Sequence, residues 1–148
     1  MPTLTDPVIS REIMLDHYSN PNNKKTPENI NDYQHIRMDS TSCIDDITIY
    51  AKINNGVIQD CLFDGVACVI CTSSTDIMCD LVKGKTIEEA TSIINEYLSM
   101  IYEKPFDEDI LEEAVVFKNT YKQAARIKCA TLGWNGLNSI INGDSENE

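Results

Sequence analysis

The apolar positions near the start of the chain repeat at helical spacing. Residues 8–18 carry apolar and polar side chains at the 3.6-residue period of an amphipathic helix, and Pro21 prevents its continuation. Residues 20–31 are rich in Asn, Lys and Pro, a composition typical of a loop. The first part of the chain therefore predicts a short helix followed by a polar connection.

From Ile36 onwards the period changes to two. Apolar and polar residues alternate over residues 36–39 and again over 47–54, as in antiparallel strands with one buried face, and Tyr50 falls on the polar face. The run Asn54-Asn55-Gly56 supplies the left-handed conformations that a tight hairpin needs. Residues 57–63 are expected to return as the next strand.

Past Gly65 the pattern becomes helical. Ser73 or Ser74 is expected to cap a helix, and Lys83-Gly84-Lys85 is expected to close it. The apolar positions of this helix are Ile77, Met78, Leu81 and Val82.

The remaining chain predicts further helices. Thr86-Ile87-Glu88-Glu89 has the form of a capping box, and an apolar stripe at helical spacing extends behind it to Ile101. Pro105 is expected to end that helix, and a short acidic helix is predicted over residues 109–117. The last helix is recognised by one apolar face, formed by Ala130, Trp134, Leu137 and Ile141.

Strands followed by a run of helices indicate the α+β class. The expected architecture is a small three-stranded antiparallel sheet packed against an N-terminal helix and several C-terminal helices. A length of 148 residues suits one domain over residues 1–148. Within it we expect a frayed N-terminus at residues 1–7 and a frayed acidic tail at residues 143–148.

The charge balance excludes one class of function. The chain has 12 Lys+Arg against 24 Asp+Glu, a net charge of −12, whereas a nucleic-acid binder needs a basic face. Acidic patches instead suit a basic partner. The longest apolar run, residues 66–71, is too short to span a membrane, and the first residues lack the pattern of a signal peptide. We therefore expect a cytoplasmic protein with reduced cysteines.

Three of the six cysteines lie in connections between predicted elements, where functional residues concentrate. Cys43 follows the first strand, Cys68 lies between the last strand and a helix, and Cys129 is expected at a helix start. Asp45 follows Cys43 closely, so three thiolates and a carboxylate could form a tetrahedral zinc site. Their spacing matches no compact zinc finger, and buried cysteines that serve only as small hydrophobic residues are the alternative.

The other thiols favour structural roles. Cys61 lies within a predicted strand and Cys79 within a predicted helix, so both are interpreted as core residues. Cys71 forms a C-x-x-C pair with Cys68, a spacing also found in redox and zinc sites, and its role in sulfur exchange stays open beside a structural one. His17 and the only other histidine, His35, are interpreted as polar surface residues or as satisfied buried ones.

Four segments of the chain carry a family resemblance: Met14-Leu15-Asp16-His17-Tyr18-Ser19-Asn20-Pro21, Ser42-Cys43-Ile44-Asp45-Asp46, Phe63-Asp64-Gly65-Val66-Ala67-Cys68 and Ala125-Arg126-Ile127-Lys128-Cys129-Ala130-Thr131-Leu132-Gly133-Trp134. Together they resemble the U-type iron–sulfur assembly proteins, the IscU/NifU-like family, and most closely its SufU branch. The resemblance extends from about residue 9 to residue 141. Lys128 occupies the position where the scaffold branch has a His, and a long stretch near residues 104–116 is similar to the extra segment of SufU-type proteins.

The resemblance implies a function and a ligand set. Zinc would be held by Cys43, Asp45, Cys68 and Cys129, and Cys43 would accept persulfide sulfur from a SufS-type cysteine desulfurase. Arg126 matches a family arginine near the site, where it would help orient partner or ligand groups. Downstream iron–sulfur assembly proteins are the implied recipients. The protein would then be an enzyme, a sulfurtransferase that acts together with the desulfurase.

Two alternatives accompany this interpretation. The same cysteines could hold a transient 2Fe–2S cluster, as in an assembly scaffold, or the zinc could be purely structural in an interaction module. Ile44 stands where the family usually has Gly, and a β-branched residue restricts the backbone of that loop. Ile44 therefore favours a more static site than the family pattern, whereas Lys128 favours sulfur transfer over the scaffold.

Overall fold

The computed structural model describes residues 6–40 and 44–143. Cys43 and most residues of the predicted frayed ends therefore lie outside the described residues. Asp6 caps the first helix, which begins at Pro7. The single-domain organisation over residues 1–148 stays a prediction. The elements in chain order are α1 (Pro7–Ser19), η1 (Ile30–Asp32), β1 (Gln34–Asp39), β2 (Asp46–Asn54), β3 (Val57–Val66), α2 (Val69–Val82), α3 (Ile87–Ile101), α4 (Glu108–Leu111), η2 (Glu112–Phe117), η3 (Thr120–Lys122) and α5 (Ala124–Ile141).

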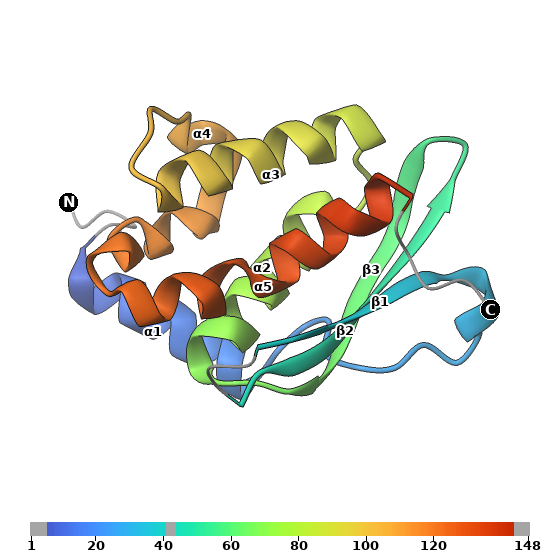
Figure 1. Ribbon diagram of the computed structural model, residues 1–148, viewed down its shortest axis with the longest axis horizontal. Coiled ribbons are helices and arrows are strands. Elements are labelled where there is room, and N and C mark those ends of the chain that lie inside the picture. Colours follow the sequence, from blue (N-terminus) through green and yellow to red (C-terminus); the bar gives the residue numbers. More distant parts are fainter. Residues whose placement is uncertain (1–5, 41–43, 144–148) are drawn as a thin grey trace.

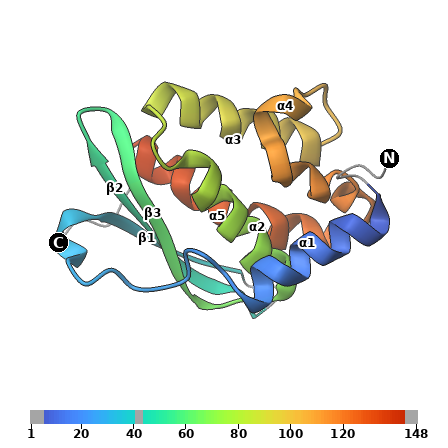
Figure 2. The ribbon, with the colours of Figure 1, turned by 180° about the vertical axis from the view of Figure 1, so that it is seen from behind.

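The predicted α+β architecture is confirmed. The three strands form one antiparallel sheet in the order β1-β2-β3. Helices α2 and α5 pack on one face of this sheet, and α1 packs on the other side of α2 (Figures 1 and 2). Helix α3 lies beyond them and contacts α5. The hydrophobic core fills the space between the sheet and these helices.

The hairpin between β2 and β3 forms where the sequence predicts it. Asn55 and Gly56 have φ values of 53° and 75°, the left-handed conformations of a two-residue turn. Ile47, Ile49 and Ala51 point into the core, as their alternation predicts. Tyr50 contradicts the pattern because it is also buried, with the ring of His35 6.0 Å away on the neighbouring strand.

Two helix starts differ from the sequence prediction. Helix α2 begins at Val69 with Cys68 as its N-cap, whereas Ser73 or Ser74 was expected to cap it. Helix α5 begins at Ala124, so Cys129 lies inside the helix and not at its start. Both helices therefore begin earlier in the chain than predicted. Ser73, Ser74 and Cys129 lie within continuous helical backbone, where their side chains do not act as caps.

The two helices that reach the cysteines cross closely. A Cβ atom at Gly133 would lie 2.3 Å from Oγ1 of Thr75, so only glycine permits this approach of α5 to α2. Beside this crossing, the rings of Tyr97 and Trp134 stack with centroids 3.8 Å apart. The indole of Trp134 also donates a hydrogen bond of 2.8 Å to Oγ of Ser74. These contacts lock α2, α3 and α5 together and fix the relative positions of Cys68 and Cys129.

The segment after α3 is less regular than predicted. The capping box of Thr86 and Glu89 is confirmed, but α3 ends at Ile101, before Pro105. The predicted acidic helix is divided into α4 and the 3-10 helix η2. Glu112 at the division has φ 46° and ψ −122°, which interrupts a continuous helix. Among the described residues, no helix has both the length and the apolar character that crossing a membrane requires.

Candidate metal centre

Three of the four residues in the implied ligand set meet at one end of the molecule. Asp45 precedes β2, Cys68 caps α2, and Cys129 lies in the second turn of α5. One ligand atom of each residue lies within 4.8 Å of those of the other two. Cys43, the fourth, lies outside the described residues. Residues far apart in the sequence are thus brought together by the sheet and the α2–α5 crossing.

Asp45 organises the ligand beside it. Its side chain is 1% exposed, and Oδ1 accepts a 2.8 Å hydrogen bond from the backbone N–H of Cys68. Its own carbonyl oxygen accepts a 2.9 Å bond from the N–H of Ser40, which fixes the segment that enters β2. Cys68 Sγ in turn lies 3.4 Å from the N–H of Cys71, in the first turn of α2. Backbone hydrogen bonds therefore orient both the carboxylate and the thiol.

The electrostatics of the trio favour a cation. Burial raises the pKa of the Cys129 thiol well above its ordinary value, and hydrogen bonds to Asp45 and Cys68 raise it further. Burial disfavours the charged thiolate, and a thiolate at Cys129 would also face a carboxylate and a second sulfur. A bound dication reverses this preference, because it stabilises the thiolates that otherwise repel one another.

The geometry of the donors fits zinc. Zn–S bonds of about 2.3 Å and Zn–O bonds of about 2.0–2.2 Å place tetrahedral ligands roughly 3.5–3.8 Å apart. Cys68 Sγ lies 3.7 Å from Oδ2 of Asp45, within that interval. Two sulfurs and one carboxylate oxygen are a donor set that zinc accepts, and they leave a fourth tetrahedral position.

Comparison of the chain with known proteins identifies its family. Residues 9–138 match the NifU-like N-terminal domain. The chain belongs to this family. It is 35% identical over 130 residues to the zinc-dependent sulfurtransferase SufU of Bacillus subtilis, covering 87% of this chain and 86% of that protein. It is also 35% identical over 100 residues to the iron–sulfur cluster assembly scaffold protein IscU of Thermotoga maritima, covering 68% and 70% of the two chains.

Solved structures agree with this membership. The crystal structure of FiSufU from Fervidobacterium islandicum AW-1 superposes with a TM-score of 0.79 at 28% identity, over 86% of this chain and 92% of that chain. The N-terminal part of a NifU-like protein from Brucella abortus has a TM-score of 0.78 at 20% identity over 96% and 97% of the chains, a likeness of fold. The resemblance drawn from the four sequence segments is therefore confirmed.

Within this NifU-like domain the remaining cysteines lie in the core. Cys61 and Cys79 are both fully buried, as predicted. Burial raises the pKa of Cys79, and a hydrogen bond to Cys61 adds to the effect. Cys71 is fully buried too, and it is the backbone N–H of Cys71 that faces Cys68. The C-x-x-C spacing thus places one thiol at the candidate centre and the other in the core.

Arg126, which the resemblance implies near the site, occupies the first turn of α5, before Cys129 on the same helix. Its backbone N–H donates a 2.8 Å bond to the carbonyl of Gln123, and its side chain is exposed.

Two apolar side chains lie next to the candidate ligands on the sheet side. Ile44 is 66% exposed beside Asp45, and Val66 is 63% exposed at the end of β3.

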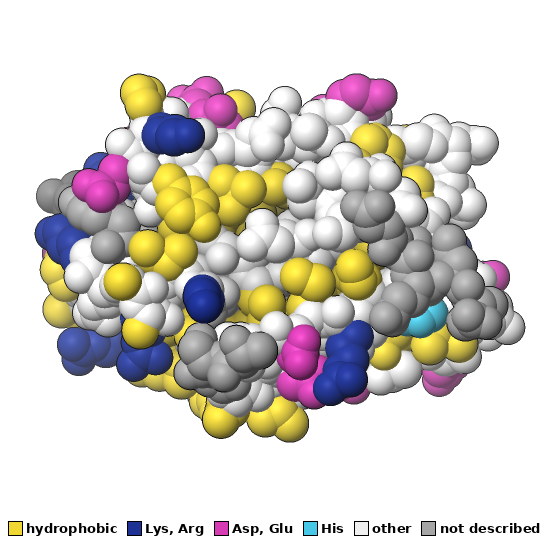
Figure 3. Space-filling view, in the orientation of Figure 1, with side chains coloured by type: hydrophobic (Ala, Val, Ile, Leu, Met, Phe, Trp, Pro, Cys, Tyr) yellow, Lys and Arg dark blue, Asp and Glu magenta, His cyan; other side chains and the backbone are white. Residues whose placement is uncertain are grey.

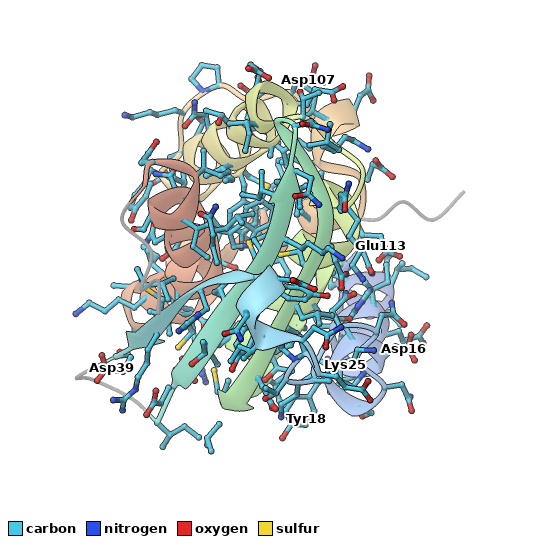
Figure 4. The ribbon with its side chains drawn as sticks, turned by 90° about the vertical axis from the view of Figure 1, so that its right-hand side faces the viewer. Asp16, Tyr18, Lys25, Asp39, Asp107 and Glu113 are labelled. Carbon is cyan, nitrogen blue, oxygen red and sulfur yellow. The ribbon has the colours of Figure 1, made fainter. Side chains whose placement is uncertain are left out.

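His17 has a role that the sequence pattern did not reveal. Its Nδ1 lies 2.5 Å from Oδ2 of Asp76 on α2, and its Nε2 lies 2.8 Å from Oε1 of Glu113 on η2. Figure 4 shows Glu113 above α1, consistent with this bridge. Asp76 also accepts hydrogen bonds from the backbone N–H groups of Asn22 and Asn23. The motif histidine therefore joins three elements.

His17, Asp76 and Asp80 form a second group of potential metal ligands. Side-chain amides already occupy both carboxylates, because Asn23 donates to Asp76 and Asp80 and Asn22 donates to Asp80. We therefore interpret this group as a hydrogen-bonded anchor. Its only sequence signal is the family motif itself, since periodicity carries no information on long-range polar partners.

Proposed function

We propose that the protein is a zinc-dependent sulfurtransferase of iron–sulfur cluster biogenesis, which accepts sulfur on Cys43 from a SufS-type cysteine desulfurase. The observation that carries the proposal is the convergence of Asp45, Cys68 and Cys129 in a geometry that suits zinc. The similarity to the B. subtilis zinc-dependent sulfurtransferase SufU supports it. Cys43 is the proposed fourth ligand and the acceptor.

The chemistry of transfer is a thiol–persulfide exchange. The Cys43 thiolate attacks the outer sulfur of the persulfide on the desulfurase, a new S–S bond forms on Cys43, and the desulfurase cysteine leaves as a thiolate. No net oxidation occurs, because one S–S bond replaces another. Bound zinc would keep the cysteine ligands deprotonated and in place. Asp45 and Cys68 hold the site while Cys43 reacts, and exposed Arg126 is placed to meet anionic groups of the partner.

An assembly scaffold that holds a transient 2Fe–2S cluster is the second candidate. The 35% identity to the T. maritima scaffold IscU favours it, and the same cysteines would serve as ligands. Lys128, where the scaffold branch has a His, favours sulfur transfer. The two functions predict different metals, one zinc per chain or iron with acid-labile sulfide.

Native mass spectrometry and persulfide mapping test the proposal. We expect one zinc per chain in the aerobically purified protein. With a SufS-type desulfurase and free cysteine, the peptide containing Cys43 should gain the mass of a sulfur atom, and desulfurase turnover should rise. Cys43→Ala should abolish both effects, whereas Cys61→Ala, in the fully buried core, should keep both.

Three outcomes would contradict the proposal. A protein that carries iron and sulfide would favour the scaffold. Zinc without any sulfur on Cys43 would favour a structural site in an interaction module. A Cys43→Ala variant that still raises desulfurase turnover would remove Cys43 from the acceptor role.

A further inference from the structure

The basic side chains of this acidic protein are unevenly distributed. Residues 114–143 contain Lys118, Lys122, Arg126 and Lys128 but none of the 24 Asp and Glu residues of the chain. The preceding residues 107–113 carry acidic side chains and no basic one. In the space-filling view several dark blue side chains lie at the lower left, where α1 and the N-terminal end of α5 overlap (Figure 3). The candidate metal centre therefore lies beside a locally basic surface.

The exposed side chains of η3, of the first two turns of α5 and of the residues next to Asp45 and Cys68 have the composition of an interface. Lys122, Arg126 and Lys128 are all exposed. Ile44 and Val66, at 66% and 63% exposure, supply apolar area next to the ligands Asp45 and Cys68. Protein interfaces commonly have an apolar centre and a polar rim, and exposed apolar residues at a site mark an interaction surface.

A groove continues this surface away from the ligands. It has a volume of about 250 Å³ and is lined by Asp39, Ser40, Lys128, Thr131, Leu132 and Asn135. Asp39 is its one acidic lining residue, and nearby Asp46 is already paired with Arg37 at 2.6 Å. The groove thus presents a lysine, hydroxyl groups and an amide, which are hydrogen-bond donors suited to a carboxylate.

We infer that the sulfur donor docks on one face of this protein, formed by Ile44, Val66, Lys122, Arg126 and Lys128. The matching surface of the donor carries acidic side chains around an apolar contact. The inference rests on the proposed function and specifies the partner surface. It reverses the expectation that an acidic protein seeks a basic patch. At physiological ionic strength, exposed charges separated by more than about 8 Å are largely screened from one another. Once the two surfaces meet, the nearby Lys122, Arg126 and Lys128 therefore outweigh the net charge of −12.

Charge reversal with a matched control tests this polarity. The double variant Lys122→Glu/Lys128→Glu is compared with Lys24→Glu/Lys25→Glu, which changes net charge equally at exposed residues beside β3. Figure 4 shows Lys25 on the opposite side of this end of the sheet from Asp39, which lines the groove. Turnover of a SufS-type desulfurase is measured against the concentration of each full-length, zinc-loaded protein.

We expect the first double variant to raise the half-saturating concentration about tenfold or more at low salt, and the control to change it little. The effect should shrink in 0.5 M NaCl (roughly a 4 Å screening length), and Lys122→Arg/Lys128→Arg should behave as wild type. Zinc content by native mass spectrometry checks the ligand set, and Lys122→Glu alone serves as the test if Lys128→Glu loses zinc.

Two results separate the inference from the function on which it rests. Wild type that raises desulfurase turnover while both double variants behave alike would overturn the basic docking face and leave sulfur transfer intact. Wild type that neither gains sulfur nor raises turnover would overturn the proposed function together with the inference.

Discussion

At the scale of single residues, Asp45 positions Cys68 independently of any metal. Its buried carboxylate accepts the N–H of Cys68 at 2.8 Å, and this N–H belongs to the N-cap residue of α2. Asp45, a proposed ligand, thus also holds the backbone of the next proposed ligand. Removing the charge and removing the acceptor are therefore separable changes.

Asp45→Asn and Asp45→Ala separate these two contributions. Both variants should bind zinc more weakly in a chelator competition, because each lacks the anionic oxygen. Only Asp45→Ala should also destabilise the metal-free protein, by about 1–3 kcal/mol in denaturant unfolding, because it leaves the Cys68 N–H without its acceptor. Equal stability of the two metal-free variants would show that the hydrogen bond does not hold the site.

Residue types predicted the candidate centre better than their local positions did. Placement in connections and a donor set that zinc accepts make Cys68, Cys129 and Asp45 candidates, the family resemblance implies them as ligands, and the fold does bring them together. The orientation of Cys71 was not predictable, since it depends on where α2 begins. With Cys68 as N-cap, Cys71 lies in the first helical turn and its thiol is buried. The bridge of His17 was missed for a similar reason, because both partners come from distant segments.

At the scale of elements, short-range signals were the dependable ones. The Asn55-Gly56 turn and the Thr86–Glu89 capping box are both present, because each is determined by neighbouring residues. Helix starts without such a signal were misplaced, as at α2, whose N-cap is the thiol of Cys68. The division of residues 108–117 into α4 and η2 also had no local signal, since Glu112 is an ordinary helix former.

The backbone at Glu112 provides a test of that division. With φ 46° and ψ −122°, this exposed residue occupies a region that favours glycine. Glu112→Gly should therefore raise the free energy of unfolding by about 1 kcal/mol in chemical denaturation. Glu88→Gly, at an exposed position in the first turn of α3, is the control and should lower it by about 1 kcal/mol. Equal losses in both variants would argue against strain at Glu112.

At the scale of the whole molecule, His17 connects the N-terminal helix to α2 and to the 3-10 helix η2. Both of its ring nitrogens face carboxylates, on Asp76 and Glu113. Only the protonated imidazole can donate from both nitrogens, so the bridge between α1, α2 and η2 is complete when His17 is charged. Burial lowers the pKa of His17, but the hydrogen bonds and charges of Asp76 and Glu113 outweigh it and raise the pKa above its usual 6.5.

This bridge makes the stability of the fold depend on pH. Because the folded pKa exceeds the unfolded one, the contribution of His17 is fully present below about pH 6.5 and is lost as pH rises through the folded pKa. His17→Gln should lower the free energy of unfolding by roughly 1–3 kcal/mol at pH 6, and the difference from wild type should narrow above the folded pKa. His35→Gln is the control, since no hydrogen bond from His35 to a carboxylate is found in the described part of the chain. Denaturant unfolding of the zinc-saturated proteins from about pH 5.5 to about pH 9 (roughly one unit below to two and a half units above the usual histidine value) measures the difference. A difference between wild type and His17→Gln that stays constant with pH would mean that the protonated bridge does not form.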